Sequence, residues 1–253
     1  DAELLLAHVL GIPRTRLLLA PAPTDHERTR YADLVTRRAA REPLQHITGS
    51  APFRHLDLAV GPGVFVPRPE TELLIDAVLA DRPHVVVDLC AGSGALALAV
   101  AHEAPGTAVY ALERDPDALA WLRRNAAGTS VTVTDGDVTD ASVLSELHGR
   151  VDAVVSNPPY VPSETVVEPE VHADPAAAVF AGGDGLAVIP AVIGRAADLL
   201  RPGGLVVIEH DDSHGTVVPE LLRADGRWAE IADHPDLSGR ARFVTARRCC
   251  PHS

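Results

Sequence analysis

The sequence predicts an α/β fold in which a seven-stranded, mostly parallel, doubly wound sheet follows a small helical domain and a β-hairpin linker. Strand-like and helix-like segments alternate with regularity over residues 67–253, which is typical of a parallel sheet covered by helices on both faces. A glycine-rich turn joins the first strand of this region to its helix. The last two strand-like segments follow one another with no helix between them, which indicates an antiparallel pair at one edge of the sheet.

The first part of the chain, residues 1–50, predicts the small helical domain. Residues 1–10 are rich in apolar side chains and stop at Gly11, a residue that favours the end of a helix. A second helix is predicted over residues 24–41, because this segment begins on a capping threonine and ends before Pro43. We therefore expect short helices and no strands in this domain.

The linker between the two domains is predicted over residues 51–66. Residues 56–60 alternate between apolar and polar side chains, Gly61-Pro62-Gly63 is a turn sequence, and residues 64–66 are apolar and β-branched or aromatic. We expect residues 56–60 and 64–66 to pair as the two strands of a hairpin. The large domain then extends over residues 67–253.

The elements of the large domain follow from composition and periodicity. Short β-branched runs predict strands, and longer stretches with apolar residues at helical spacing predict helices. One of these helices has Asp115 as its cap and Pro116 as its first residue, both of which favour a helix start. The predicted strands are residues 85–89, 108–112, 131–133, 151–156, 205–209, 228–232 and 242–246. The predicted helices are residues 95–102, 116–125, 141–148 and 186–200.

Composition narrows the classes of function. No apolar run approaches the ~18 residues that span a bilayer, and no basic segment precedes an apolar stretch at the start of the chain. Three cysteines, two of them adjacent, neither make a disulfide framework nor have metal-ligand spacing. We expect a monomeric, soluble protein of the cytoplasm. The chain has no methionine, even at position 1, from which we expect that the true start lies upstream.

The charge of the chain disfavours a nucleic-acid partner. The formal net charge is −13, whereas proteins that bind nucleic acid through its phosphates usually present a basic face. Arg37, Arg38 and Arg41 gather on one predicted helix. We interpret them as a solvated helix face rather than a phosphate-binding patch.

A cofactor-binding turn is predicted after the first strand of the large domain. Gly92 and Gly94 allow the backbone to approach a ligand closely and leave the amides of the following helix facing it. The same glycines also satisfy the NAD pattern, and Glu113, about 20 residues on, could bind the ribose of either cofactor. Asp88 favours S-adenosylmethionine, because a carboxylate there helps to hold the ammonium and sulfonium groups and would repel a pyrophosphate. The antiparallel edge pair also matches a class I (Rossmann-like) methyltransferase sheet.

The segment Asn157-Pro158-Pro159-Tyr160 directly follows a predicted buried strand. A planar NH₂ group is fixed by two acceptors in its own plane and by a flat surface above it. The side-chain carbonyl of Asn157 and the backbone carbonyl of Pro158 supply the acceptors, and Tyr160 can stack on the amide. The prolines stiffen the loop, so the carbonyls are set before the acceptor molecule arrives. We predict Asn157, Pro158 and Tyr160 as catalytic residues and all four residues as substrate-binding.

With these segments in place, the chain resembles the protein-(glutamine-N5) methyltransferases, the release factor glutamine methyltransferase family, which modify the glutamine of the Gly-Gly-Gln motif in peptide chain release factors. The likeness extends over almost the whole chain. Besides the Asn157–Tyr160 segment, it is carried by Pro43–Gly49, Phe65–Glu72, Gly182–Leu186 and Asp236–Arg240. The resemblance implies that the helical domain recognises a release factor.

The resemblance also implies a set of cofactor-binding residues. They are the loop Cys90-Ala91-Gly92-Ser93-Gly94, Glu113, the loop around Val138, and Asn157, which would also grip the glutamine together with the rest of its segment. Cys90 stands where the family usually has glycine, and Glu209-His210 stands where it usually has Glu-Gly. Asp137 is expected to border the adenine.

Other classes of function remain open at this point. Adenine N6 and guanine N2 present the same planar NH₂ geometry, so a nucleic-acid methyltransferase is the alternative enzyme, and it would have to flip its base out of a duplex. A non-catalytic scaffold and an NAD oxidoreductase fit less of the sequence. No metal is expected: the His210–His214 segment is interpreted as a surface cluster, and Asp135-Gly136-Asp137 lacks the glutamate of a calcium loop.

Overall fold

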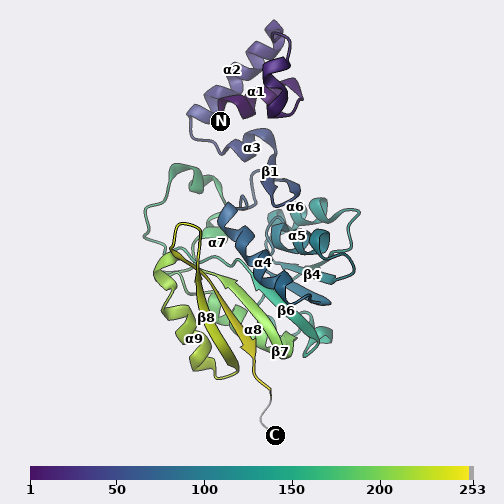
Figure 1. The fold of residues 1–253 in the computed structure, drawn as a ribbon. Coiled ribbons are helices and arrows are strands. Elements are labelled where there is room, and N and C mark those ends of the chain that lie inside the picture. The colour runs from purple at the N-terminus through teal and green to yellow at the C-terminus, as the bar shows by residue number, and fades with distance from the viewer. Residues whose placement is uncertain (251–253) are drawn as a thin grey trace.

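The computed structural model describes residues 1–250, in which a small helical part is joined to a large α/β part (Figure 1). The helical part contains α1 (Ala2–Leu10), the 3₁₀ turn Arg14–Leu19, α2 (Asp25–Ala39) and the short α3 (Leu44–Thr48). Both helices predicted there are confirmed. A reciprocal capping box between Thr24 and Glu27 starts α2. The core of this part is small and consists of Leu5, Val9, Leu34 and Ile47.

A hairpin follows the helical part, but not with the strands that we predicted. It pairs β1 (Ser50–Phe53) with β2 (Leu56–Ala59), and its turn is Arg54-His55. The prediction of residues 64–66 as a strand is wrong, because Val64 and Val66 are instead buried with Ala118 of α6 (Pro116–Ala126). The turn-like Gly61-Pro62-Gly63 therefore leads into an irregular segment that packs on a helix.

The large part is built on a seven-stranded mixed sheet in the order β5-β4-β3-β6-β7-β9-β8. The first five strands in this order run parallel, and β9 pairs antiparallel with both β7 and β8. Each of the seven predicted strands is present, and the antiparallel edge pair is confirmed. The strands are β3 (Val85–Leu89), β4 (Ala108–Glu113), β5 (Thr132–Asp135), β6 (Val151–Ser156), β7 (Leu200–Glu209), β8 (Trp228–Pro235) and β9 (Ala241–Arg248).

Helices cover both faces of this sheet (Figure 1). On one face, α4 (Leu73–Ala80), α5 (Ala95–Glu103) and α6 pack on alternate strand residues such as Val86 and Val207. On the other face, α8 (Ile189–Leu199) and α9 (Val217–Asp225) pack on their neighbours, such as Val87 and Val206. The alternation of the two sets along each strand follows from the period of two in a β-strand. Helices α4 and α9 were not predicted from the sequence.

The helix that we predicted over residues 141–148 is wrong. The structure has only the 3₁₀ turn Ser145–Leu147 there, and Leu144 has a positive φ of 58°. Buried Arg195 of α8 donates to the carbonyls of Val138, Asp140 and Ala141. The Asp140 carbonyl also accepts from the Val143 amide at 3.3 Å, but this turn is not continued, because Leu144 leaves the helical region of the backbone.

A long connection from β6 to α8 links the two parts of the molecule. It contains the 3₁₀ turn Pro169–Ala173 and the short α7 (Ala176–Val179). Arg38 and Arg41 at the end of α2 pair with Glu170 at 2.9 and 2.7 Å, and buried Asp174 accepts a hydrogen bond from the Val66 amide of the linker at 3.1 Å. Across residues 1–250, none of the helices has the length and apolar character needed to cross a membrane.

Candidate active site

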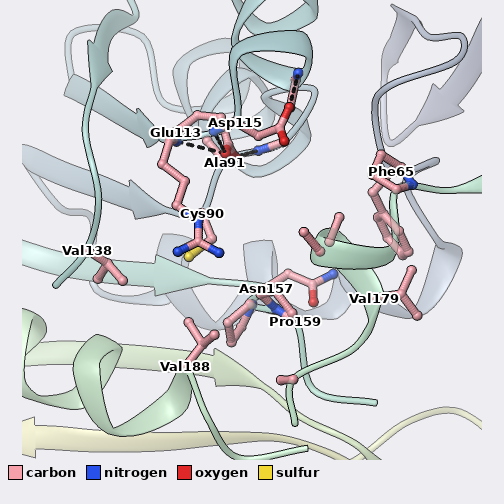
Figure 2. Close-up of a pocket in the computed structure, with 18 of the residues that line it drawn as sticks. Phe65, Cys90, Ala91, Glu113, Asp115, Val138, Asn157, Pro159, Val179 and Val188 are labelled. Carbon is pink, nitrogen blue, oxygen red and sulfur yellow. Dashed lines mark hydrogen bonds between the residues drawn. The ribbon is translucent and has the colours of Figure 1, made fainter. Parts of the chain in front are cut away.

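A cavity of about 680 Å³ opens at the carboxyl ends of the parallel strands. Four segments of its wall directly follow β3, β4, β5 and β6, and further walls come from the linker and from the long connection after β6. Figure 2 shows Phe65 and Val179 on one side of Asn157, with Cys90 and Val138 on the other. Of the predicted site residues, those that line the cavity are Cys90, Ala91, Gly92, Ser93, Glu113, Asp137, Val138, Asn157, Pro158, Pro159 and Tyr160. Asp88 and Gly94 are not part of this lining.

The loop after β3 turns tightly enough to bring backbone amides to the cavity. Gly92 and Gly94 both have positive φ, 56° and 88°, which glycine adopts without steric cost. A Cβ on Gly94 would lie 2.6 Å from the Leu122 side chain of α6, so this glycine also permits the close packing of the loop on the helix. Gly94 is therefore structural, and Ala91 to Ser93 supply the wall.

Glu113 holds this loop from the end of β4. Its Oε2 accepts from the Gly92 amide at 2.8 Å, and its Oε1 accepts from the amides of Arg114 and Asp115, also at 2.8 Å. The side chain is largely buried but lines the cavity. A carboxylate oxygen has two lone pairs, so Glu113 can order the loop and still accept one hydroxyl donor from a ligand on Oε2, which accepts only from Gly92.

Cys90 occupies a left-handed backbone conformation, with φ of 64°. An L-residue in that region is strained by about 1–2 kcal/mol, which is consistent with the expectation of glycine at this position. Burial raises the pKa of the Cys90 thiol to about 12, so the side chain is a neutral, weakly polar wall at physiological pH.

Asp88 lies behind the loop rather than in the cavity wall. It is fully buried, and its Oδ2 accepts from the Ala97 amide in the first turn of α5 at 3.0 Å. Its Oδ1 has no hydrogen-bond partner within residues 1–250. Burial raises the pKa of Asp88 to about 8. The structure thus places this carboxylate at a helix start, and a direct contact with a ligand would require it to reach past the loop.

The wall that follows β5 carries Asp137 and Val138. Asp137 accepts from the Thr139 amide and hydroxyl and pairs with Arg114 at 2.9 Å, and these contacts lower the pKa of Asp137 to about 2. Val138 is buried, and its carbonyl accepts from Arg195. The two residues give this end of the cavity one apolar surface and one fixed negative charge.

The Asn157–Tyr160 segment presents two unused acceptors. Asn157 Nδ2 donates to the Thr71 hydroxyl at 3.1 Å, which orients the amide and leaves its carbonyl as the free group. Neither Asn157 Oδ1 nor the Pro158 carbonyl accepts a hydrogen bond from any residue of the range 1–250. The Tyr160 hydroxyl donates to buried Glu209 at 2.7 Å. The segment can therefore receive an NH₂ group as its composition suggested.

Several wall residues were missed when roles were assigned from the sequence. Phe65 comes from the linker, Thr71 from the 3₁₀ turn Pro69–Glu72 that follows it, and Val179 from α7. The Arg68 guanidinium lies 4.9 Å from the centroid of the Phe65 ring, which fixes that ring beside the cavity. Phe65 and Thr71 belong to the Phe65–Glu72 motif, so the resemblance marked the segment without assigning these side chains. Val179 has no motif that could have indicated it.

The segment interpreted as a surface cluster is more buried than expected. His210 Nε2 lies 2.8 Å from Asp233 Oδ1, and His214 Nε2 lies 2.9 Å from the Asp184 carbonyl. Both histidines are buried, which contradicts their interpretation as surface residues. No group of three potential metal-ligating side chains occurs in the described part of the chain.

Two family models match the chain. Residues 1–49 match the PrmC N-terminal domain, and residues 55–174 match the methyltransferase small domain. A release factor glutamine methyltransferase of Mycolicibacterium smegmatis is 50% identical over 98% of this chain and 90% of its own length. Another from Streptomyces coelicolor is 50% identical over 99% of this chain and 91% of its own length.

A solved structure supports the fold independently of close sequence identity. A methyltransferase of Pyrococcus furiosus superposes with a TM-score of 0.58 over 88% of this chain and 99% of that protein, at 18% identity. The sheet and its helices are therefore those of the methyltransferase fold. The cavity at the carboxyl edge lies where such a fold places its ligands.

Proposed function

The chain belongs to the release factor glutamine methyltransferase family, and we propose that it transfers a methyl group from S-adenosylmethionine to the N5 amide nitrogen of the glutamine in the Gly-Gly-Gln motif of release factors. The observation that carries this proposal is the pair of free acceptors, Asn157 Oδ1 and the Pro158 carbonyl, in the wall of the same cavity as Glu113 and the glycine loop. One wall receives an amide, and the other suits a nucleoside.

The residues present fit the proposed cofactor. Gly92 has a positive φ and no atom within 4 Å of the position of a Cβ, so the loop leaves room for a ligand. Glu113 Oε2 offers an acceptor for a ribose hydroxyl, and Val138 offers an apolar surface for a base. Bound there, S-adenosylmethionine supplies an already activated methyl group. We include Asp88 and Gly94 in the proposed set as residues that support the loop from outside the cavity.

The chain's own contribution to the chemistry is positional. An amide nitrogen is a poor nucleophile because its lone pair is delocalised, so in-line placement has to provide much of the rate. Favourable positioning lowers a barrier by up to about 7–11 kcal/mol in good cases. Asn157 and Pro158 hold the two N–H donors, and Tyr160 and Pro159 form the walls beside the amide. The nitrogen that has gained the methyl group is strongly acidic and releases one proton to water. No general base is required.

We propose that residues 1–50 recognise the release factor, that residues 51–66 link the parts, and that residues 67–253 carry the transfer. The contacts of Arg38 and Arg41 with Glu170 support a docked arrangement in which an acceptor bound to the helical part faces the cavity. We further propose a monomer that acts in the cytoplasm, where its acceptor works in translation.

The test compares acceptors directly. The chain is incubated with methyl-labelled S-adenosylmethionine and either an unmodified release factor, tRNA or duplex DNA. The proposal predicts label in the release factor alone, and label in tRNA or DNA alone would overturn it in favour of a nucleobase amino group. The Asn157→Ala variant should lose transfer and keep most of its affinity for the cofactor in calorimetry. If cofactor affinity falls as far as turnover, Asn157 serves the cofactor rather than the amide.

A further inference from the structure

A buried carboxylate lies behind Asn157–Tyr160, which we call the amide-reading segment. Glu209 is the last residue of β7 and is 1% exposed. Strand β7 pairs with β6 through Ser156 and Ile208, which places Glu209 beside the segment that begins at Asn157. It is not among the residues that line the cavity. A charged group in such a position is costly unless the surrounding groups compensate it.

Two hydroxyls face this carboxylate. The Tyr160 hydroxyl donates to Glu209 Oε1 at 2.7 Å. Thr71, which is 3% exposed, lies close enough for its hydroxyl to lower the pKa of Glu209, as Tyr160 also does. Glu209 Oε2 is buried and has no hydrogen-bond partner in the described residues. The Thr71 hydroxyl accepts from Asn157 and donates to no acceptor within residues 1–250, so this oxygen is the group available to take the Thr71 proton.

Charged groups on the neighbouring elements act on Glu209 in both directions. Burial raises its pKa above the usual value, and the charge of Glu70 in the 3₁₀ turn Pro69–Glu72 also raises it. The hydroxyls of Thr71 and Tyr160 and the charge of Arg242 of β9 act against this rise, and Arg242 is itself held by Asp236 at 3.0 Å. In the carboxylate form, which these groups favour, Glu209 can only accept hydrogen bonds.

Glu209 then determines which group donates and which accepts in the hydrogen bonds of Thr71 and Asn157. A threonine hydroxyl has one proton to donate. If that proton is directed to the carboxylate, the Thr71 oxygen is left to accept, and it accepts from Asn157 Nδ2 at 3.1 Å. Asn157 must then present its carbonyl, and not its NH₂ group, to the cavity. A donor in place of the carboxylate would reverse this chain and turn the Asn157 amide over.

We propose that Glu209 is a positioning residue for amide methylation, which sets the orientation of Asn157 through Thr71 and holds the Tyr160 ring directly. This inference rests on the function proposed above. It adds the residue that makes Asn157 present its carbonyl oxygen, and not its NH₂ group, to the cavity. The residues involved come from the 3₁₀ turn Pro69–Glu72, the segment after β6 and the end of β7. The turn that follows the linker thereby takes part in positioning the acceptor.

Glu209→Gln tests the proposal at constant side-chain shape. The glutamine NH₂ group can donate to Thr71 or to Tyr160, so the hydroxyls no longer share a pure acceptor. We expect kcat for the acceptor to fall by about tenfold or more, a loss that corresponds to one misdirected hydrogen bond. KM for the acceptor and the Kd of S-adenosylmethionine should stay within about twofold, because contacts outside the amide contribute most of the binding. Glu220→Gln, an exposed glutamate on α9, is the matched control and should leave kcat unchanged.

Two variants of Thr71 give an independent test if the Glu209→Gln variant does not fold. Thr71→Val keeps the size of the side chain and removes the hydroxyl, and Thr71→Ser keeps the hydroxyl. We expect Thr71→Val to lose kcat as Glu209→Gln does and Thr71→Ser to restore most of it. Equal kcat for wild type and Glu209→Gln, or equal kcat for the two Thr71 variants, would overturn the proposal. Losses of kcat that only follow losses of unfolding free energy and cofactor affinity would also overturn it.

These measurements separate the inference from the proposed function. If the wild-type chain methylates tRNA or DNA in place of a release factor, the proposed acceptor is wrong. The same variants are then compared on the acceptor that is methylated, and the kcat pattern still decides the role of Glu209. A planar NH₂ group requires the same acceptor polarity in either case.

Discussion

Gly185 lies in the loop before α8 and touches the amide-reading segment through its backbone. Its φ is 76°, and a Cβ there would overlap the carbonyl oxygen of Tyr160 and lie 2.9 Å from His214 Cε1. Both neighbours are held in place, because the Tyr160 hydroxyl is bound to Glu209 and His214 Nε2 lies 2.9 Å from the Asp184 carbonyl. The change Gly185→Ala should therefore displace Tyr160.

The same loop offers two controls that separate the sources of the effect. Gly182 also has a positive φ, 77°, but a Cβ there meets only Ala187 at an ordinary 3.5 Å, and Gly183 has neither a positive φ nor an atom within 4 Å. Gly182→Ala should then cost the left-handed strain alone, about 1–2 kcal/mol. Gly185→Ala should add an overpacking cost of about 1–3 kcal/mol. Gly183→Ala should be within about 0.5 kcal/mol of wild type.

Urea unfolding gives the three free energies, and methyl transfer to the acceptor gives the functional effect. A displacement of ~1 Å at the reacting group can lower turnover by about 100-fold, so Gly185→Ala should lose far more activity than Gly182→Ala. Cofactor affinity should change little in all three variants. If Gly185→Ala matches Gly182→Ala in both unfolding free energy and turnover, the contact between this loop and Tyr160 does not position the site.

Three further predictions concern the walls of the cavity. Cys90→Gly removes the backbone strain at a φ of 64° and should raise the free energy of unfolding by up to about 1 kcal/mol. Methyl transfer should be retained. A lower free energy of unfolding would show that packing of the thiol outweighs the strain. Arg195→Met removes the side-chain donor to the carbonyls of residues 138, 140 and 141, of which the Asp140 carbonyl keeps only its bond from the Val143 amide, and should lower the free energy of unfolding by about 2–4 kcal/mol and weaken cofactor binding. Unchanged calorimetric binding would separate this wall from the cofactor site. Asp88, with its pKa raised to about 8, contributes stability that is full below its unfolded pKa near 4 and is lost as pH rises through the folded value. The unfolding free energy of Asp88→Asn minus that of wild type should accordingly rise with pH between about 4 and 8, by at most about 1.4 kcal/mol per unit, and a flat difference would refute a protonated Asp88.

Local signals were sufficient to predict most of the large domain. The seven strands could be found because each contains a short run of β-branched, aromatic or other apolar residues, too short for a helix and separated from the next by turn residues or a helical segment. The turn at Gly92 and Gly94 could be predicted because a tight turn with positive φ favours residues without a Cβ. Asn157 to Tyr160 could be proposed as the segment that binds an amide, because the donors and acceptors that an NH₂ group needs are few and specific; that role stays a prediction.

The errors arose where distant contacts decide the local structure. The hairpin turn uses Arg54 with a positive φ of 53°, a conformation that arginine seldom adopts and that no turn signature indicates, while a proline in β1 lowers its strand character. In the segment 141–148, Arg195, about 50 residues away, holds the carbonyl of Ala141, and Leu144 has a positive φ that interrupts a helix. The place of Glu209 behind the site depends on the pairing of β6 with β7 and has no motif of its own.

The central claim is that the chain methylates a side-chain amide which Asn157 and Pro158 hold by its two donors. Peptide mass spectrometry of a release factor, before and after incubation with the chain and S-adenosylmethionine, tests it most directly. The account predicts a single added methyl group, located by fragmentation on the glutamine of the Gly-Gly-Gln motif and absent with Asn157→Ala. A methyl group on any other residue, or an unmodified glutamine beside methylated nucleic acid, would contradict it.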